Sequence, residues 1–171
     1  YGQSPISLGA DVVMHSATKF IGGHSDLVAG VLVTNDSSIA EELYFIQKSG
    51  GAILSPFDSW MLLRSTKTLA LRVQQHSNNA MIIAQTLQKF SKVKSVIYPG
   101  LSSHSQHYLA ARQQKNPSGD SIYGSMISFE CETLKVREIF LKKTRLFTLA
   151  ESLGGVESLV CVPYEMTHAS V

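Results

Sequence analysis

Residues 15–26 read His-Ser-Ala-Thr-Lys-Phe-Ile-Gly-Gly-His-Ser-Asp, and they are the most informative stretch of this chain. Before them, residues 9–15 have the short apolar core of a buried strand, which places Ser16 and Lys19 at or just beyond its carboxyl end. Open α/β sheets bind their ligands at that edge, so we expect Lys19 to point into a cleft. A lysine in such a place is a candidate covalent catalyst.

The residues around Lys19 fit a cofactor that carries both an aldehyde and a phosphate. The hydroxyls of Ser16 and Thr18 can donate hydrogen bonds to an anion, and a desolvated lysine amine attacks carbonyl groups. Pyridoxal phosphate is such a cofactor, held as a lysine Schiff base and acting as an electron sink for carbanions. The plain alternative is a solvated surface lysine after a strand.

The same residues also match S-x-x-K, the motif of serine-nucleophile acyl enzymes such as penicillin-binding proteins. That chemistry needs S-D-N and K-T-G motifs downstream, where this chain has Ser25-Asp26-Leu27 and Lys67-Thr68-Leu69. In addition, we expect Ser16 to follow a strand, whereas the nucleophile of those enzymes opens a helix. An acyl enzyme that uses Ser16 is therefore a remote alternative.

The lysine segment, Leu8 to Gly30, resembles that of the pyridoxal-phosphate enzymes of cysteine and methionine metabolism. This family includes cystathionine γ-synthase, cystathionine γ-lyase, cystathionine β-lyase and methionine γ-lyase. The similarity continues in the segments Gly-Ala-Ile-Leu-Ser-Pro-Phe-Asp-Ser-Trp-Met-Leu-Leu-Arg (51–64), Val-Ile-Tyr-Pro-Gly-Leu-Ser-Ser-His (96–104), Ala-Glu-Ser-Leu-Gly-Gly-Val-Glu-Ser-Leu (150–159) and Met-Thr-His-Ala (166–169). The resemblance therefore covers nearly the whole chain.

The resemblance implies an α/β protein of the PLP-dependent transferase fold type I, the class of aspartate aminotransferase. Residues 1–65 would form the C-terminal part of the cofactor-binding large domain, and residues 66–171 a linking helix and an incomplete small α+β domain. Members of the family are roughly twice as long, so we expect either a piece of a longer protein or a truncated product. In relatives, a cofactor-binding aspartate, a stacking aromatic residue and a substrate-binding arginine lie outside the part that this chain matches.

The resemblance also implies an activity, which is making or breaking the C–S bond of cystathionine or a related sulfur amino acid. Lys19 would hold pyridoxal 5'-phosphate and move protons as base and acid, while Ser16 and Thr18 would bind its phosphate. Glu151 and Ser152 precede two adjacent glycines and would line the substrate pocket. Glu151 favours γ-chemistry and a cystathionine lyase; γ-synthase, methionine γ-lyase and a truncated, non-catalytic piece are the alternatives.

Composition narrows the class of protein. Hydrophobic residues make up 44% of the chain and charged residues 16%, which allows a sizeable core and argues against disorder. The absence of a long apolar run or a signal-peptide pattern leads us to expect a cytoplasmic protein without a membrane partner. A net charge of +2 without a basic cluster argues against a nucleic-acid partner. Relatives assemble as dimers of dimers, so a homo-oligomer is implied.

Cysteine and histidine spacing implies no metal site. Cys131 and Cys161 form neither a metal motif nor a disulfide framework, so we expect both to be reduced and buried. The six histidines show no H-E-x-x-H or comparable spacing.

Periodicity and capping signals predict alternating strands and helices. Asp36 or Ser37 should open one helix and Ser55-Pro56 another, which begins a long helical region. Later in that region, one apolar stripe is formed by Ala80, Ile83, Ala84 and Leu87. The helix opened by Asp36 or Ser37 should cover residues 38–48. The other expected elements are strands at 29–34, 93–98 and 126–131 and a helix at 134–143.

Overall fold

The computed structural model of the protein describes residues 1–166. The similarity at residues 166–169 and the end of the expected second domain therefore lie outside the described residues, apart from Met166. In chain order the elements are the short 3-10 helix η1 (Ile6–Leu8), β1 (Val13–Ser16), β2 (Gly30–Val33), α1 (Ser37–Gly50), α2 (Pro56–Thr66), α3 (Leu69–Leu87), β3 (Val93–Ile97), α4 (His107–Gln113), β4 (Ser128–Cys131), α5 (Leu134–Lys143), β5 (Phe147–Leu149), β6 (Ser158–Val160) and α6 (Pro163–Met166).

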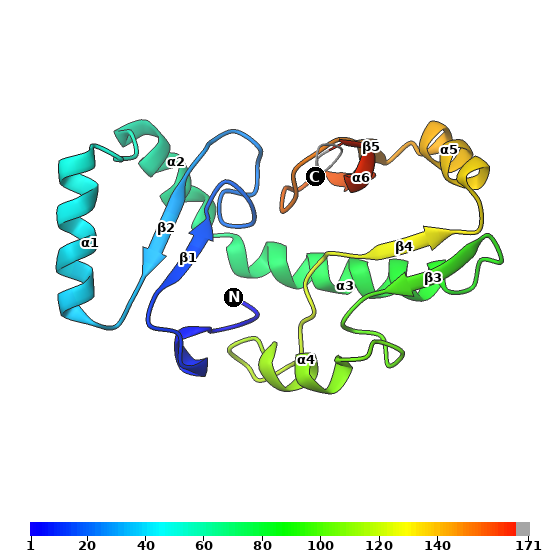
Figure 1. The fold of residues 1–171 in the computed structure, drawn as a ribbon, viewed down its shortest axis with the longest axis horizontal. Helices are drawn as coiled ribbons and strands as arrows, with labels where there is room; N and C mark the ends of the chain where they lie inside the picture. Colours follow the sequence, from blue (N-terminus) through cyan, green and yellow to red (C-terminus); the bar gives the residue numbers. More distant parts are fainter. Residues whose placement is uncertain (167–171) are drawn as a thin grey trace.

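Helix α3 connects the two ends of the fold (Figure 1). Strands β1 and β2 with helices α1 and α2 lie at its beginning, and β3, β4 and α5 lie at its far end. In this view, α4 and the β5–α6 segment lie on opposite sides of α3. The mixed α/β arrangement agrees with the fold class that the sequence predicts.

Strands β1 and β2 form an antiparallel pair, with Val13 opposite Val33 and Ser16 opposite Gly30. The prediction of a buried strand before Lys19 is wrong for this chain, because Met14 is 69% exposed and His15 and Ser16 are exposed as well. Among the described residues, β1 pairs only with β2, so a two-stranded ribbon leaves most of its side chains uncovered.

The two predicted helix starts are confirmed, and each is a side-chain cap. Asp36 Oδ1 accepts hydrogen bonds from the backbone N–H groups of Ser38 and Ile39, at 2.8 and 3.1 Å. Hydrogen bonds from the Ser38 hydroxyl and from these N–H groups lower the pKa of Asp36. Ser55 Oγ accepts from Asp58 N at 3.1 Å, with proline at the first turn of α2.

The core lies between α3 and the β3 side of the molecule. The predicted stripe on α3 is confirmed for Ala80 and Ala84, which are 3% and 0% exposed and pack with Tyr98 and Leu101, whereas Ile83 and Leu87 are only partly buried. The buried Tyr98 hydroxyl donates to Gly124 O at 2.9 Å. Burial raises the pKa of Tyr98, so the ring stays neutral and keeps its donor. Tyr123 N donates to Ser77 Oγ at 2.9 Å, which fixes the chain after α4 against the long helix.

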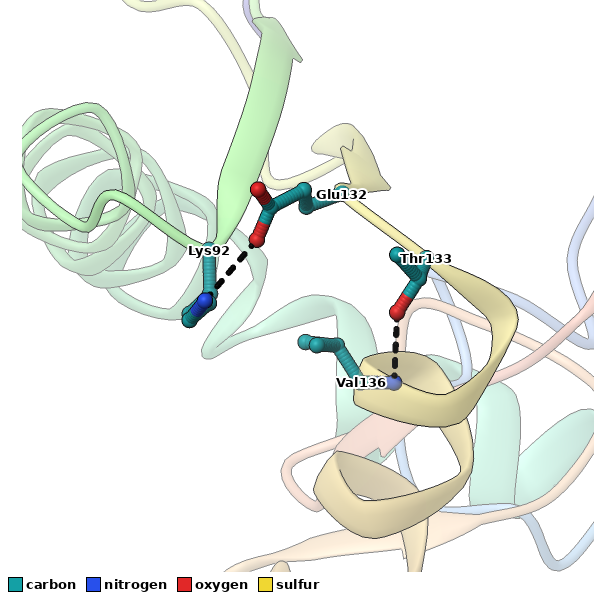
Figure 2. A network of polar contacts seen from close by, with 4 residues as sticks. All are labelled: Lys92, Glu132, Thr133 and Val136. Carbon is teal, nitrogen blue, oxygen red and sulfur yellow. Dashed lines mark hydrogen bonds and ion pairs between the residues drawn. The ribbon is translucent and has the colours of Figure 1, made fainter.

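Polar contacts mark the turn from β4 into α5 (Figure 2). Lys92 Nζ pairs with Glu132 at 3.0 Å, and Thr133 Oγ1 caps α5 by accepting from Val136 N at 3.3 Å. Strand β4 itself pairs antiparallel with β3, whereas β5 and β6 form a separate parallel pair. The ion pair is exposed on both sides and adds little stability, so the cap does more to start α5.

Both cysteines carry free thiols. Burial raises the pKa of the partly buried Cys131 thiol. Cys161 is exposed, contrary to the prediction, because it lies in the connection that leaves β6 for α6. In residues 1–166, the structure contains no helix that is both long and apolar enough to cross a membrane.

Candidate active site

Lys19 lies in the loop of residues 17–29, which connects β1 to β2. Lys19 N donates to Ser16 O at 3.2 Å, and Gly23 N donates to Lys19 O at 2.7 Å. Gly22 N donates to Ala17 O at 2.7 Å. These bonds wind the chain into tight turns directly after the strand, as the expected place of Lys19 at a strand end requires.

Thr18 closes this loop at its base. Its Oγ1 accepts a hydrogen bond from Ala29 N at 2.9 Å and lies 3.4 Å from Ala29 O. Thr18 N also donates to Ala29 O, at 3.2 Å. The second contact of Oγ1 is long, so the hydroxyl proton can turn toward another acceptor. Thr18 therefore has a structural role as an acceptor, and its hydroxyl can still donate a hydrogen bond to another group.

The side chain of Lys19 reaches Ser152, although the two residues are 133 positions apart. Lys19 Nζ lies 3.4 Å from Ser152 Oγ. Ser152 has a positive φ of 88°, which a serine adopts rarely, and it lies in the connection from β5 to β6. The fold thus brings together two residues that the sequence predicts for one site.

The glycines after Ser152 let that connection lie directly on the lysine loop. Gly154 has φ +81°, and a Cβ built on it would lie 2.5 Å from Phe20 N and 2.8 Å from Lys19 C. Val156 N donates to Gly23 O at 3.1 Å. Gly154 therefore allows the backbone of this connection to approach the backbone beside Lys19 closely.

A cleft of about 720 Å³ opens beside these two loops. Its polar lining includes three predicted site residues and three carboxylates that the sequence analysis did not single out: Thr18, Glu151, Ser152, Asp26, Asp58 and Glu157. Lys19 contacts this lining through Ser152. Ser16 is exposed at the end of β1 and is not a lining residue.

Arg72 is the main residue of this region that sequence reasoning missed. From α3, its guanidinium donates to Phe20 O at 2.6 Å and to Ile21 O at 3.1 Å, the two carbonyls that follow Lys19. It also donates to Ser65 O and Thr68 Oγ1, both at 3.0 Å. The sequence feature that could have pointed to Arg72 is a charged residue among apolar ones, in Leu69-Ala-Leu-Arg-Val73.

His76 follows Arg72 by one helical turn and lies against Phe20. The two rings meet edge to face with centroids 5.9 Å apart. Burial, and then the positive charge of Arg72, lower the pKa of His76, which favours the neutral ring. The lysine loop therefore rests on α3 through one cationic and one aromatic contact.

The arrangement can bind a carbonyl compound covalently and an anion noncovalently. Lys19 supplies a half-buried primary amine, and Thr18 supplies a hydroxyl on the cleft wall. Glu151 and Ser152 face the same cleft from the other loop. Such a set suits a small molecule that carries both a carbonyl group and an anionic group.

Comparison with known proteins identifies the family. The family model described as "Cys/Met metabolism PLP-dependent enzyme" matches residues 1–171. The chain belongs to this family. This match confirms the family resemblance seen in the sequence, and with it the expected cofactor, pyridoxal phosphate. The S-x-x-K alternative loses its support, because Ser16 ends strand β1 and does not open a helix, and because the family is defined by pyridoxal phosphate.

Relatives with three different activities are similar to the chain. Cystathionine β-lyase of Lactococcus lactis subsp. cremoris (strain MG1363) is 52% identical to the chain over 171 residues. Cystathionine γ-lyase of Dictyostelium discoideum is 51% identical over 172 residues. Each alignment covers 100% of the chain and 43% of the relative. The crystal structure of cystathionine γ-synthase from Xanthomonas oryzae pv. oryzae with cystathionine has a TM-score of 0.92 at 45% identity, covering 99% of the chain and 42% of that structure's chain.

Two conclusions follow from these similarities. The structural match confirms the predicted α/β fold class of PLP-dependent enzymes. The chain spans about 43% of the length of the curated relatives that it matches. Because a β-lyase and a γ-lyase are almost equally similar to the chain, at 52% and 51% identity, identity does not separate the members of the family.

The residues in the cleft fit pyridoxal phosphate. The aldehyde of this cofactor needs an amine, which Lys19 offers at the edge of the cleft, and its phosphate needs donors. Thr18 Oγ1 keeps a proton that its long contact with Ala29 O, at 3.4 Å, holds only weakly. Ser16 is exposed at the end of β1, outside the lining of the cleft.

Proposed function

We propose that this chain carries the cofactor-binding lysine of an enzyme that cleaves or forms the C–S bond of cystathionine-like sulfur amino acids, with cystathionine lyase favoured. The observation that carries this proposal is the contact of Lys19 Nζ with Ser152, at 3.4 Å, beside a cleft that Thr18 and Glu151 also line. Family membership supports the chemistry, and the three activities among the relatives support the range of substrates.

In this proposal, Lys19 holds pyridoxal 5'-phosphate covalently, and Ser16 and Thr18 donate hydrogen bonds to its phosphate. When bound, pyridoxal phosphate supplies an electron sink for the carbanion formed at the substrate Cα. Lys19 removes the Cα proton as general base and, for γ-chemistry, moves a second proton at Cβ. The contact with Ser152 keeps the amine at the cleft edge, where these protons are exchanged.

Glu151 and Ser152 are proposed to contact the substrate. Both line the cleft, on the loop that also contacts the lysine segment. A carboxylate beside the scissile side chain can interact with the distal amino group of a cystathionine-like substrate, and of the possible reactions we favour γ-elimination. The same position is compatible with β-elimination and with γ-replacement.

For the whole protein we propose a cytoplasmic homo-oligomer, arranged as a dimer of dimers. The free thiols of Cys131 and Cys161 suit a reducing compartment. Large apolar side chains such as Tyr44 and Phe45, each 67% exposed, suit a protein with further contacts. We also propose that residues 1–65 belong to the cofactor-binding domain and residues 66–171 to a linking helix and small domain.

Turnover of cystathionine by the complete polypeptide that contains residues 1–171 tests the proposed reaction. A β-lyase releases a three-carbon 2-oxo acid, a γ-lyase releases a four-carbon one, and a synthase forms cystathionine from cysteine and an activated four-carbon amino acid. We expect release of a thiol and a 2-oxo acid, abolished by Lys19→Ala and preserved by Lys89→Ala, at an exposed lysine. Equal turnover by both variants would remove Lys19 from the mechanism.

A further inference from the structure

Arg72 joins the lysine loop to the junction between α2 and α3. Its Nη1 donates to Phe20 O at 2.6 Å, and its Nη2 to Ile21 O at 3.1 Å. On the other side, Nη2 donates to Ser65 O and Nε to Thr68 Oγ1. One guanidinium thus fixes two consecutive carbonyls of the loop against two acceptors of the helical scaffold.

The packing around this guanidinium leaves no room for a side chain at Gly23. A Cβ built on Gly23 would lie 2.6 Å from Arg72 Cζ, and the residue has φ +69°. Gly23 N in turn donates to Lys19 O at 2.7 Å, which closes the turn that carries the lysine. Gly23 is therefore matched to the arginine as well as to the turn.

The position of Lys19 is set from two sides. Gly154 lies against the peptide between Lys19 and Phe20 from the β5–β6 connection, and Arg72 holds the next two carbonyls from α3. Only a planar fork of five N–H donors can serve several carbonyl groups in this way, so lysine is not equivalent to arginine here.

We propose that Arg72 is a positioning residue that holds the Lys19 loop in the conformation in which the lysine amine attaches the cofactor. The inference rests on the proposed function of Lys19. Arg72 acts through the backbone of Phe20 and Ile21, and its guanidinium is occupied by protein acceptors. Its loss should therefore impair attachment at Lys19 more than noncovalent binding of the cofactor.

The test compares covalent and noncovalent binding in the complete polypeptide. Covalent attachment is measured as the pyridoxal-phosphate concentration that gives half-maximal labelling of Lys19 after borohydride reduction and peptide mapping. Noncovalent affinity is measured by titration in a Lys19→Ala background. We expect Arg72→Gln to raise the half-maximal labelling concentration by about tenfold or more, and to change noncovalent affinity by less than about threefold.

Matched variants separate positioning from general damage. Arg112→Lys changes an exposed arginine in α4 and should label like the parent, whereas Arg72→Lys should recover only part of the labelling. Gly23→Ala keeps the arginine but displaces its guanidinium, so it should reduce labelling as Arg72→Gln does. If Arg72→Gln does not melt cooperatively, the inference is tested with Arg72→Lys and Gly23→Ala, again by comparing the loss of covalent labelling with the change in noncovalent affinity.

The outcomes distinguish this inference from the proposed function. No labelling of Lys19 in the parent would refute the proposed function and, with it, the inference. Labelling of the parent and of folded Arg72 and Gly23 variants at the same concentrations would overturn the inference alone. Equal losses in covalent and noncovalent binding would also overturn it, because Arg72 would then shape the cofactor site as a whole.

Discussion

The loop that carries Lys19 and the strands that carry the loop are held very differently. The loop is fixed by Thr18 at its base, by Arg72 from α3 and by Val156 N from the β5–β6 connection. The strands on either side form a two-stranded ribbon in which Met14 and Leu32 are 69% and 52% exposed. The chain therefore contains the contacts that hold the Lys19 loop, whereas the faces of the β1–β2 ribbon remain largely exposed.

Mutations in the fixed loop and mutations on the open ribbon should therefore have different effects. Side chains that hold the loop are few and specific, so replacing one of them should alter the position of Lys19. Side chains on the open faces of β1 and β2 make little contact within residues 1–166, so replacing them should cost little in this chain.

The largest effect is expected for Gly154→Ala. The new Cβ would lie 2.5 Å from Phe20 N on a backbone with φ +81°, and we expect a loss of about 3 kcal/mol or more in unfolding free energy. Gly119→Ala is the matched control, because Gly119 has φ +89° with nothing within 4 Å of its Cβ, and should cost only about 1 kcal/mol. Similar costs in denaturant unfolding would show that the close approach of Gly154 to the lysine loop is unimportant.

A smaller effect is expected for Thr18→Val. This change keeps the shape of the side chain but leaves Ala29 N without its acceptor, at a cost of about 1 to 3 kcal/mol. It also removes a donor to the cofactor phosphate, so the affinity for pyridoxal phosphate should fall about tenfold.

Thr86→Val is the control for stability, because the Thr86 hydroxyl donates back to Ile82 O within its own helix, on an exposed part of α3. Thr18→Ser should retain most of the affinity, since it keeps the hydroxyl. If Thr18→Val melts like Thr86→Val and binds the cofactor like the parent, Thr18 neither closes the loop nor binds phosphate.

How far the sequence predicts the structure depends on the range of the interactions. The caps by Asp36 and Ser55 were predictable because a cap involves residues two or three positions apart. The stripe through Ala80 and Ala84 was predictable because helical periodicity decides which side chains are buried together. Lys19 was found because its neighbours in the sequence carry the chemical signal.

Contacts between distant segments were not predictable in the same way. Arg72 meets Phe20 across 52 positions, and no local pattern tells that its guanidinium turns toward that loop. The sequence pointed to a glycine loop after Ser152 but could not tell that Gly154 packs on the lysine backbone. The burial of β1 was overestimated because apolar strand residues predict a covered strand, while coverage depends on neighbouring strands.

The smallest effect is expected on the open ribbon, where two leucines can be compared. Leu32 in β2 is 52% exposed, whereas Leu101 in the core is 6% exposed. In residues 1–171, Leu101→Ser should cost about 2 to 5 kcal/mol in unfolding free energy, and Leu32→Ser about 1 kcal/mol or less. Equal losses in thermal or denaturant melts would mean that β2 is covered in solution.

The most direct test of this account is to locate the covalent site of the cofactor. The complete polypeptide is incubated with pyridoxal 5'-phosphate, reduced with borohydride, digested and analysed by mass spectrometry. We predict one modified peptide, with the label on Lys19, and no specific label in Lys19→Ala. A label on another lysine, or equal labelling of the parent and Lys19→Ala, would contradict the assignment of Lys19 as the cofactor-binding residue.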